Sequence, residues 1–351
     1  MVEIDLDITR AKTLPSKFYI DSQIFQSTIS KFKSNWTFVG HTSQFDENSI
    51  FPITINQEQL IITKSDGEFR CLSNVCTHRG MILQTEQECK KTLICSYHGR
   101  TFSLDGRLKN MPGFENAVDF PSESDNLPTF DLEIWNNLIF VSQDPELPFS
   151  DWIKDVNERM SFLDLEKMVY DSSRERNYTI NANWALYVDN YLEGFHIPFV
   201  HKDLNNALQY NQYETQLFET SVLQIGIAQE GVPYFEIPEG HQDSGKKIAA
   251  YYWWLYPNLM LNFYPWGLSL NLVKPITVDT TEICYSGFIL DKELLGKGAG
   301  GDLDKVELED QFIVESCHLG MKSSSYKRGR YSPTMEKGVH HFHRILTDNN
   351  D

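Results

Sequence analysis

Two short segments of the same design lie in residues 73–102, SNVCTHRGMILQTEQECKKTLICSYHGRTF. The first contains Cys76 and His78, and the second contains Cys95 and His98. Each pair lies between short β-type runs, which puts both pairs on loops. Two thiolates and two imidazoles in matched pairs are a metal-ligand set. The stretch therefore predicts one metal site on loops between the strands of a β-rich domain.

The spacing of the four ligands distinguishes two kinds of metal site. Two Cys and two His suit a structural zinc ion, which is the alternative. Cys-x-His followed by Cys-x-x-His, however, is the spacing of a Rieske [2Fe-2S] cluster, in which the thiolates hold one iron and the imidazoles hold the other. We therefore predict a Rieske cluster bound by Cys76, His78, Cys95 and His98.

The whole chain is globular and acidic. It has 351 residues, with 31 Lys+Arg against 49 Asp+Glu and a formal net charge of −18. That charge opposes the phosphates of nucleic acids and of anionic lipids, so we expect neither nucleic acid nor membrane as a partner. The first residues lack the basic and apolar regions of a secretion signal. We expect a cytoplasmic protein that acts on a small molecule.

The dipeptides Asp66-Gly67, Asp105-Gly106 and Asn136-Asn137 predict tight turns between β-type runs. Turn signals and periodicity divide the chain into three parts. These are a helical N-terminal segment at 1–35, a β domain at 36–145 and a second domain at 146–351. In the second domain, helical patterns at 184–196 and 302–321 accompany strand-like runs at 248–256, 259–264, 267–274 and 281–290. The predicted fold class is α+β, with an antiparallel β domain followed by an antiparallel sheet backed by helices.

A second polar cluster lies in NWALYVDNYLEGFHIPFVHKDL, residues 183–204. Its members are Asp189, Asn190, Glu193, His196 and His201. On one continuous helix, Asp189, Glu193 and His196 share a face, whereas His201 points about 140° away from His196. Pro198 interrupts the helix, so both imidazoles can face one metal ion. The simpler alternative is two hydrogen-bonded core histidines.

Two His and one carboxylate form the facial triad of non-heme Fe(II) oxygenases, so a downstream acid is needed. The apolar residues of the predicted helix at 302–321 form one stripe: Val306, Ile313, Cys317 and Met321. Asp310 lies on that stripe, and an acid on a buried face is costly unless it is paired or bound to metal. We favour Asp310 as the ligand. Glu307 and Glu309 stay open as alternatives, although a solvated acidic helix start also explains them.

Taken together, the three patterns resemble those of the alpha subunits of Rieske non-heme iron oxygenases, the ring-hydroxylating oxygenase superfamily. The resemblance covers nearly the whole chain. It implies a helix-grip-like catalytic domain, a Rieske [2Fe-2S] cluster, O2 as co-substrate, and a mononuclear Fe(II) held by His196, His201 and Asp310.

The same resemblance implies a homotrimer in which the cluster of one subunit reduces the iron of its neighbour. Glu193 would then lie between His98 of one subunit and His196 of the other. Asp189 and Asn190, close to Glu193 in sequence, are expected to act in catalysis with it. Where the family often has Trp and Gln, this chain has Arg100 and His318.

Electrons are expected from a separate partner. A G-x-G-x-x-G pattern at 296–301 does not directly follow a strand, so we expect NAD(P)H to act only indirectly, through a separate flavin or iron-sulfur reductase or a ferredoxin. A third histidine group, His340, His341 and His343, lies on a predicted strand and is expected to be structural.

The run NYLEGFHIPFVH is similar to the branch that oxidises choline, glycine betaine and carnitine. A cation-binding box is expected from the aromatic residues Tyr187, Tyr191, Phe195, Phe199, Trp253, Trp254, Tyr264 and Trp266. We therefore expect a monooxygenase that hydroxylates a quaternary amine, ending in oxidation or N-demethylation. The alternatives are an aromatic-ring hydroxylating dioxygenase alpha subunit and an electron-transfer Rieske protein without oxygenase activity.

Overall fold

The computed structural model describes residues 3–348, which form two compact units. One unit runs from Ser30 to Trp152. The other joins the residues up to Ile29 to those from Ile153 onward. The segment expected at 1–35 is thus divided between the units, because the helices before Ile29 belong with the second one.

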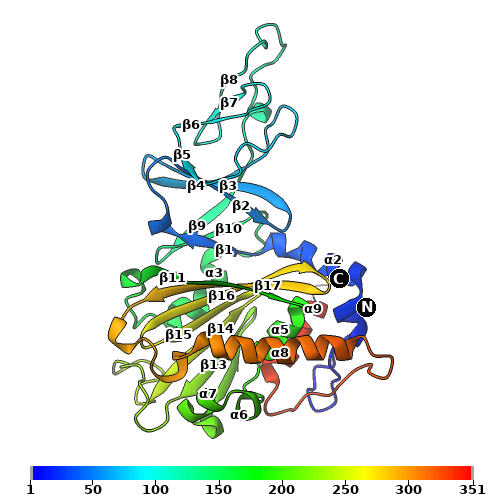
Figure 1. The fold of residues 1–351 in the computed structure, drawn as a ribbon, viewed down its shortest axis with the longest axis vertical. Coiled ribbons are helices and arrows are strands. Elements are labelled where there is room, and N and C mark those ends of the chain that lie inside the picture. Colours follow the sequence, from blue (N-terminus) through cyan, green and yellow to red (C-terminus); the bar gives the residue numbers. More distant parts are fainter. Residues whose placement is uncertain (1–2, 349–351) are drawn as a thin grey trace. The chain divides into compact units, whose positions relative to one another are not determined.

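The unit from Ser30 to Trp152 is built on a seven-stranded antiparallel sheet with the order β1-β10-β9-β4-β3-β2-β5. A small sheet, β6-β7-β8, lies at one end of this unit (Figure 1). The strands are β1 Thr37–His41, β2 Ser49–Ile55, β3 Glu58–Ser65, β4 Glu68–Ser73, β5 Glu88–Cys89, β6 Thr92–Ile94, β7 Thr101–Ser103, β8 Leu108–Asn110, β9 Thr129–Trp135 and β10 Leu138–Ser142. Short helical segments are η1 Ser30–Ser34, η2 Thr42–Gln44, η3 Glu123–Asp125 and α3 Phe149–Trp152.

Tight turns set the register of this sheet. Asp66 and Gly67, with φ of 55° and 78°, join β3 to β4. Asn136 and Asn137, with φ of 48° and 67°, join β9 to β10. Two successive positive φ values define the type I′ hairpin, whose twist matches that of the strands. The turn dipeptides predicted from the sequence are confirmed.

The second unit contains another seven-stranded antiparallel sheet, with the order β11-β17-β16-β15-β14-β13-β12. The strands are β11 Val169–Ile180, β12 Glu214–Leu217, β13 Ser221–Ile227, β14 Ile248–Leu255, β15 Leu259–Tyr264, β16 Gly267–Thr277 and β17 Thr280–Ile289. The α-helices are α1 Ser16–Ile20, α2 Ser22–Ile29, α4 Lys154–Arg159, α5 Trp184–Tyr191, α6 Ile197–Val200, α7 Lys202–Ala207, α8 Leu303–Met321 and α9 Lys337–Asp348. The 3-10 segments are η4 Leu165–Lys167, η5 Tyr210–Gln212, η6 Lys292–Leu294 and η7 Gly298–Gly300.

Helix α8 lies across one face of this sheet (Figure 1), and α5 packs against both α8 and β16. The predicted α+β class, with antiparallel sheets backed by helices, is confirmed. Strands β14 and β15 are buried along their whole length, as their continuous apolar sequences require. The polar exceptions on the central strands, Asn262, Ser269 and Asn271, are buried as well, so they face an internal polar site.

Two local predictions of secondary structure were wrong. Helix α5 ends at Tyr191, not at 196, so Glu193 and His196 follow the helix. His340, His341 and His343 lie on helix α9, not on a strand. The buried apolar positions Val339, Phe342 and Leu346 have helical spacing, which the local histidine pattern obscured.

The buried face of α8 also differs from the predicted apolar stripe. Its buried residues are Glu307, Val314 and His318. Each of them follows directly after a residue of the predicted stripe, which contained Val306, Ile313 and Cys317. Polar partners explain this difference. Glu307 accepts hydrogen bonds from tyrosines, and His318 Nε2 lies 2.7 Å from Asp279 Oδ1. Hydrophobicity alone therefore does not identify the face that is buried.

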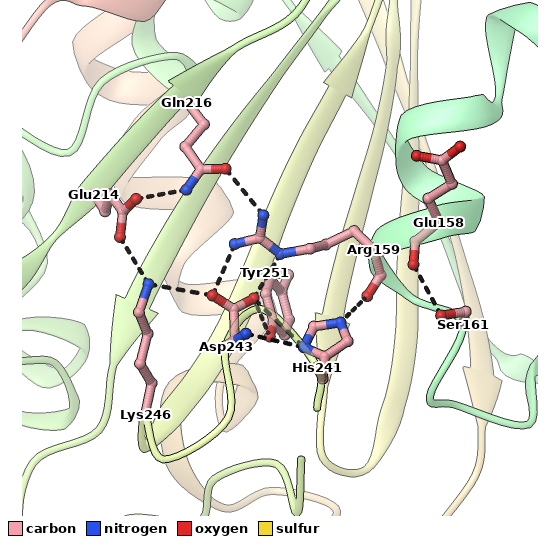
Figure 2. Close-up of polar contacts among 9 residues, drawn as sticks. All are labelled: Glu158, Arg159, Ser161, Glu214, Gln216, His241, Asp243, Lys246 and Tyr251. Carbon is pink, nitrogen blue, oxygen red and sulfur yellow. Dashed lines mark hydrogen bonds and ion pairs between the residues drawn. The ribbon is translucent and has the colours of Figure 1, made fainter. Parts of the chain in front are cut away.

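A buried ion-pair network ties the segment between β13 and β14 to helix α4 (Figure 2). Arg159 donates two hydrogen bonds to Asp243, Nε to Oδ2 at 2.5 Å and Nη2 to Oδ1 at 2.9 Å. Tyr251 and Lys246 also contact Asp243, at 3.0 and 3.2 Å. Burial acts to raise the pKa of Asp243, but Arg159 and Lys246 outweigh it and lower the pKa. The network keeps the carboxylate charged inside the unit.

Candidate active site

The structure brings His196, His201 and Asp310 together. One potential ligand atom from each lies within 4.8 Å of the others. Both imidazoles turn Nε2 toward the same atom, Asp310 Oδ1, at 3.6 Å for His196 and 3.0 Å for His201. Two imidazoles and one carboxylate on one side of a cavity are the donor set of the facial triad.

A carboxylate holds the other nitrogen of each imidazole. Glu193 Oε1 lies 2.7 Å from His196 Nδ1, and Glu309 Oε2 lies 2.8 Å from His201 Nδ1. Such partners fix the ring orientation and leave Nε2 as the ligand atom. Burial acts to lower the pKa of His201, but the hydrogen bonds and charges of Asp310 and Glu309 outweigh it and raise the pKa. The site therefore favours a positive charge between these groups, which fits a bound metal cation.

The local fold explains how the two histidines converge. After α5 ends, Glu193 accepts a 3.0 Å hydrogen bond from the backbone N of His196 through Oε2. A Cβ on Gly194 would lie only 2.8 Å from the ring of Tyr213, so this turn has room only for glycine. Pro198 lies in the first turn of α6, and His201 follows the end of that helix. The helix thus breaks before His196, between α5 and α6. Pro198 lies inside α6, the short helix that joins the two histidines, so the prediction that Pro198 interrupts a helix between them is wrong.

Asn190 and Asp189 are separated by the geometry of α5. Asn190 Nδ2 donates to Asp310 Oδ1 at 2.7 Å. Asp189 accepts hydrogen bonds from Tyr19 and contacts His343, each at 2.7 Å, and is not part of the cavity lining. Successive helical residues project about 100° apart, so only one of the two can face the cavity. The structure does not bring Asp189 to the site, contrary to expectation.

Sequence reasoning missed the role of Glu307. Its side chain is buried, with a residue exposure of 1%. It accepts hydrogen bonds from Tyr187, at 2.6 Å, and from Tyr285. Burial raises its pKa to about 7, although the two tyrosine hydroxyls partly oppose that effect. The expectation of a solvated acid was wrong, because partners distant in sequence cover this part of α8.

The cavity beside the three potential ligands is open to solvent, and the space between its walls, open solvent included, is about 730 Å³. Six tyrosines line it: Tyr187, Tyr191, Tyr213, Tyr252, Tyr264 and Tyr285. Three of these belong to the predicted aromatic box, and the others were missed. Trp253 and Trp254 are buried elsewhere, Phe199 is 77% exposed, and Trp266 stacks behind Tyr264 at 5.3 Å. The positions of the aromatic residues along the sequence did not show which of their rings would line the same cavity.

The unit from Ser30 to Trp152 brings the other four predicted ligands onto two similar loops. The backbone N of Cys76 donates to Met81 O, and that of Cys95 donates to Arg100 O, both at 2.8 Å. Both thiols are buried, and the rings of His78 and His98 are 4.8 Å apart. Two buried sulfurs beside two more exposed imidazoles fit a Rieske cluster, whose thiolates and imidazoles bind different irons.

Comparison with family models identifies both units. Residues 35–131 match the Rieske [2Fe-2S] domain, and residues 165–350 match the ring hydroxylating alpha subunit (catalytic domain). The chain belongs to the ring-hydroxylating oxygenase alpha subunits. This Rieske oxygenase is thus an oxidoreductase that uses a [2Fe-2S] cluster, mononuclear iron and O2. The match to the catalytic domain counts against a protein that only transfers electrons, and the Rieske match counts against zinc.

Curated relatives of this Rieske oxygenase include two kinds of monooxygenase. It is 29% identical to the chloroplastic choline monooxygenase of Arabidopsis thaliana, over 98% of this chain and 84% of the relative. It is also 29% identical to the carnitine monooxygenase oxygenase subunit of Escherichia coli K12, over 96% of this chain and 93% of the relative.

Solved structures share its fold. A complex of the quaternary ammonium Rieske monooxygenase CntA with an inhibitor superposes with a TM-score of 0.80, at 22% identity, over 100% of this chain and 99% of the other. A Rhodococcus naphthalene 1,2-dioxygenase gives 0.74, at 20% identity, over 95% and 94%. Among residues 3–348, no helix combines the length and apolar character needed to span a membrane.

Proposed function

We propose that this oxygenase hydroxylates a carbon of a quaternary amine, either beside the ammonium nitrogen or at an alcohol carbon. The observation that carries the proposal is the cavity, which combines six tyrosines with the acidic side chains of Glu193 and Asp310. Aromatic faces and carboxylates stabilise a cation that has lost its water. The choline and carnitine monooxygenases among the relatives support the same substrate class.

In the reaction, one atom of O2 enters a C–H bond, and the other leaves as water with two electrons and two protons. A hydroxylated N-methyl group then breaks down to formaldehyde and a tertiary amine, whereas a hydroxylated alcohol carbon becomes an aldehyde hydrate. A mononuclear iron bound in the site would supply O2 activation, and a bound Rieske cluster would supply the electrons one at a time.

The chain's own residues prepare this chemistry. His196, His201 and Asp310 are the proposed iron ligands, and Cys76, His78, Cys95 and His98 are the proposed cluster ligands. Glu193 and Glu309 hold the proton on Nδ1 of each iron-binding imidazole, so that Nε2 stays free to bind metal. Asn190 orients Asp310 by its hydrogen bond to Oδ1. The tyrosines exclude water from the substrate and hold its cationic head.

We also propose the assembly that the family resemblance implies, a homotrimer served by a separate reductase. In it, Glu193 of one subunit faces His98 of the partner subunit. A quaternary ammonium Rieske monooxygenase of the same fold has given insight into inter-subunit electron transfer, which supports this arrangement by analogy. Light scattering of the purified protein checks the mass, and a monomer in dilute solution would contradict the proposal.

A single-turnover experiment tests the proposed reaction. Anaerobically reduced protein is mixed with O2 and one candidate substrate: choline, glycine betaine, carnitine or benzoate. We expect a quaternary amine to give a hydroxylation product or formaldehyde, at up to one product per mononuclear iron. Product from benzoate alone would instead support the aromatic-ring dioxygenase alternative.

A further inference from the structure

The described residues that line the cavity include acids but no lysine or arginine. Glu193 and Asp310 face it, and Glu309 binds His201 from behind. The two charges of an Fe(II) ion would thus meet three carboxylates. A cationic substrate is stabilised there, whereas a substrate carboxylate would have no cationic side chain to pair with. An unpaired charge in a buried site is costly.

When it is ionised, Glu307 adds negative charge behind the aromatic wall. Its Oε2 accepts hydrogen bonds from Tyr187 and Tyr285, whose hydroxyls are 3.0 Å apart and whose side chains both line the cavity. Its other oxygen, Oε1, has no hydrogen-bond partner among the described residues. Phenols that donate to a carboxylate have more electron-rich rings, which strengthens cation–π attraction. The same carboxylate repels a second acid.

The remaining polar groups of the lining are neutral amides and hydroxyls. Asn262 accepts a 2.8 Å hydrogen bond from Tyr191 and donates to Asn271 at 3.2 Å. Gln224 Nε2 donates to Tyr191 O at 2.6 Å. The other end of the same amide, the acceptor Oε1, has no hydrogen-bond partner among the described residues. A hydroxyl group both donates and accepts, so it matches such groups, but a carboxylate only accepts.

A neighbouring pocket contains Arg174 and Arg176 and shares Ser269, Tyr285 and Leu303 with the cavity. It is the place where a substrate carboxylate could find positive charge. However, Arg174 lies 3.6 Å from Asp171, and Arg176 lies 3.8 Å from Asp304. With Asp302 also in the lining, three carboxylates balance two guanidinium groups. This pocket therefore offers no net positive charge.

We propose that the cavity selects a quaternary ammonium alcohol, a cation whose second polar group is a neutral hydroxyl, and discriminates against quaternary ammonium carboxylates. The inference rests on the proposed function and narrows its substrate class. It is a statement about binding, so it can be tested without turnover.

Anaerobic calorimetry of the iron-loaded protein tests it with three probes of similar size. Choline carries the cation and the hydroxyl, glycine betaine exchanges the alcohol for a carboxylate, and 3,3-dimethylbutanol replaces the nitrogen with carbon. We expect choline to bind at least about tenfold more tightly than either of the others. Glycine betaine brings a carboxylate into an acidic cavity, and 3,3-dimethylbutanol lacks the positive charge that the cavity attracts. The metal-free protein, measured in parallel, shows whether the preference belongs to the side chains.

Each other outcome has a distinct meaning. Tighter binding of glycine betaine, or of carnitine in a follow-up titration, overturns this inference and leaves the quaternary-amine function standing. Equal binding of choline and 3,3-dimethylbutanol overturns both, since the cation would then not be recognised. Binding of none of the three also overturns both.

Variants locate the selectivity. Glu307→Gln preserves size and is expected to weaken choline binding about tenfold while leaving glycine betaine unchanged or tighter. Tyr285→Phe removes one hydroxyl that donates to Glu307, so it tests the same effect of Glu307 on the tyrosine wall if Glu307→Gln is unstable. Circular dichroism and the Rieske EPR signal check folding.

Arg174→Gln is the matched control and should change the affinity for neither choline nor glycine betaine. Loss of glycine betaine binding in Arg174→Gln, from a wild type that binds it more tightly than choline, would show that the outer pocket recognises a carboxylate.

Discussion

At the scale of single residues, three acids on one turn of α8 have three different surroundings. Asp310 Oδ1 faces both imidazoles, Glu309 holds His201, and Glu307 is buried against two tyrosines. Successive residues of a helix project about 100° apart, so Glu309 and Asp310 reach different partners, whereas Glu307 lies near the face of Asp310 but meets the two tyrosines. Their roles follow from these partners and not from their residue type.

Asp310→Asn is expected to lose the mononuclear iron and keep the cluster, because an amide binds Fe(II) much more weakly than a carboxylate. Iron should fall from about three to about two per subunit, with sulfide unchanged. Metal analysis and acid-labile sulfide measure this. The control, Glu309→Gln, should retain the iron ligands but bind the ion roughly ten- to a hundredfold more weakly. Full iron and activity in Asp310→Asn would move the ligand role to another acid.

Glu307 should make stability depend on pH. Its pKa is raised from 4.5 to about 7 in the folded protein, so between these values the folded chain binds more protons than the unfolded one. Stability is then highest below the unfolded pKa and falls as pH rises toward the folded pKa, by about 3 kcal/mol in all. The facing groups are Tyr187, Tyr285 and Asp310.

Urea unfolding of metal-free protein at pH 5 and pH 8 checks this effect. The expected result is a loss of stability at pH 8 that Glu307→Gln reduces by about 3 kcal/mol. Metal must be absent, because a bound cation near Asp310 would lower the pKa of Glu307. An equal pH dependence in both proteins would mean that other groups cause it.

At the scale of elements, buried polar contacts decide how helices and loops sit on the catalytic sheet. Helix α8 buries Glu307 and His318 because Tyr187, Tyr285 and Asp279 provide partners. The segment between β13 and β14 is held in the same way, by Asp243 in the network of Figure 2. Such contacts are invisible to a hydrophobic pattern, which scores each of these residues as exposed.

Asp243→Asn should destabilise the catalytic unit by about 3 to 5 kcal/mol, because it leaves the buried guanidinium of Arg159 without a counter-charge. Asp164→Asn is the control. It breaks an exposed ion pair with Lys167, for which about 0 to 1 kcal/mol is expected. Denaturant unfolding of both variants gives the comparison. Similar losses in the two would show that burial does not matter to the Arg159 pair.

At the scale of the whole molecule, each unit contributes one redox group, so electrons must pass from one group to the other. We propose that Glu193 provides that link between subunits, since it already binds His196 through both the ring and the backbone N. Glu309 offers a matched comparison, because it holds the ring of the other histidine in the same way.

Glu193→Gln is therefore expected to keep both iron centres but slow substrate-dependent reoxidation of the reduced cluster by about tenfold or more. Glu309→Gln should show a near-normal rate per iron bound. Stopped-flow absorbance of the cluster, with O2 and substrate added, measures both. Equal slowing in the two variants would reduce Glu193 to a residue that only orients its histidine.

Local spacing and local chemistry were enough to predict much of this protein. Matched Cys and His pairs identified the Rieske loops, turn dipeptides located the hairpins, and continuous apolar runs located the buried strands. The acid and the two histidines of the proposed iron site could also be named, because few ligand sets of that kind occur on one chain. The family followed from the order of these patterns.

Which of these residues meet became clear only in the folded chain. The fold separated Asn190 from Asp189, gave Glu307 two tyrosine partners, and assembled six tyrosines from helices, strands and loops around one cavity. Local periodicity reports a hydrophobic face, but a buried polar residue depends on partners far away in sequence. The proposed substrate preference therefore had to come from the charge of an assembled cavity.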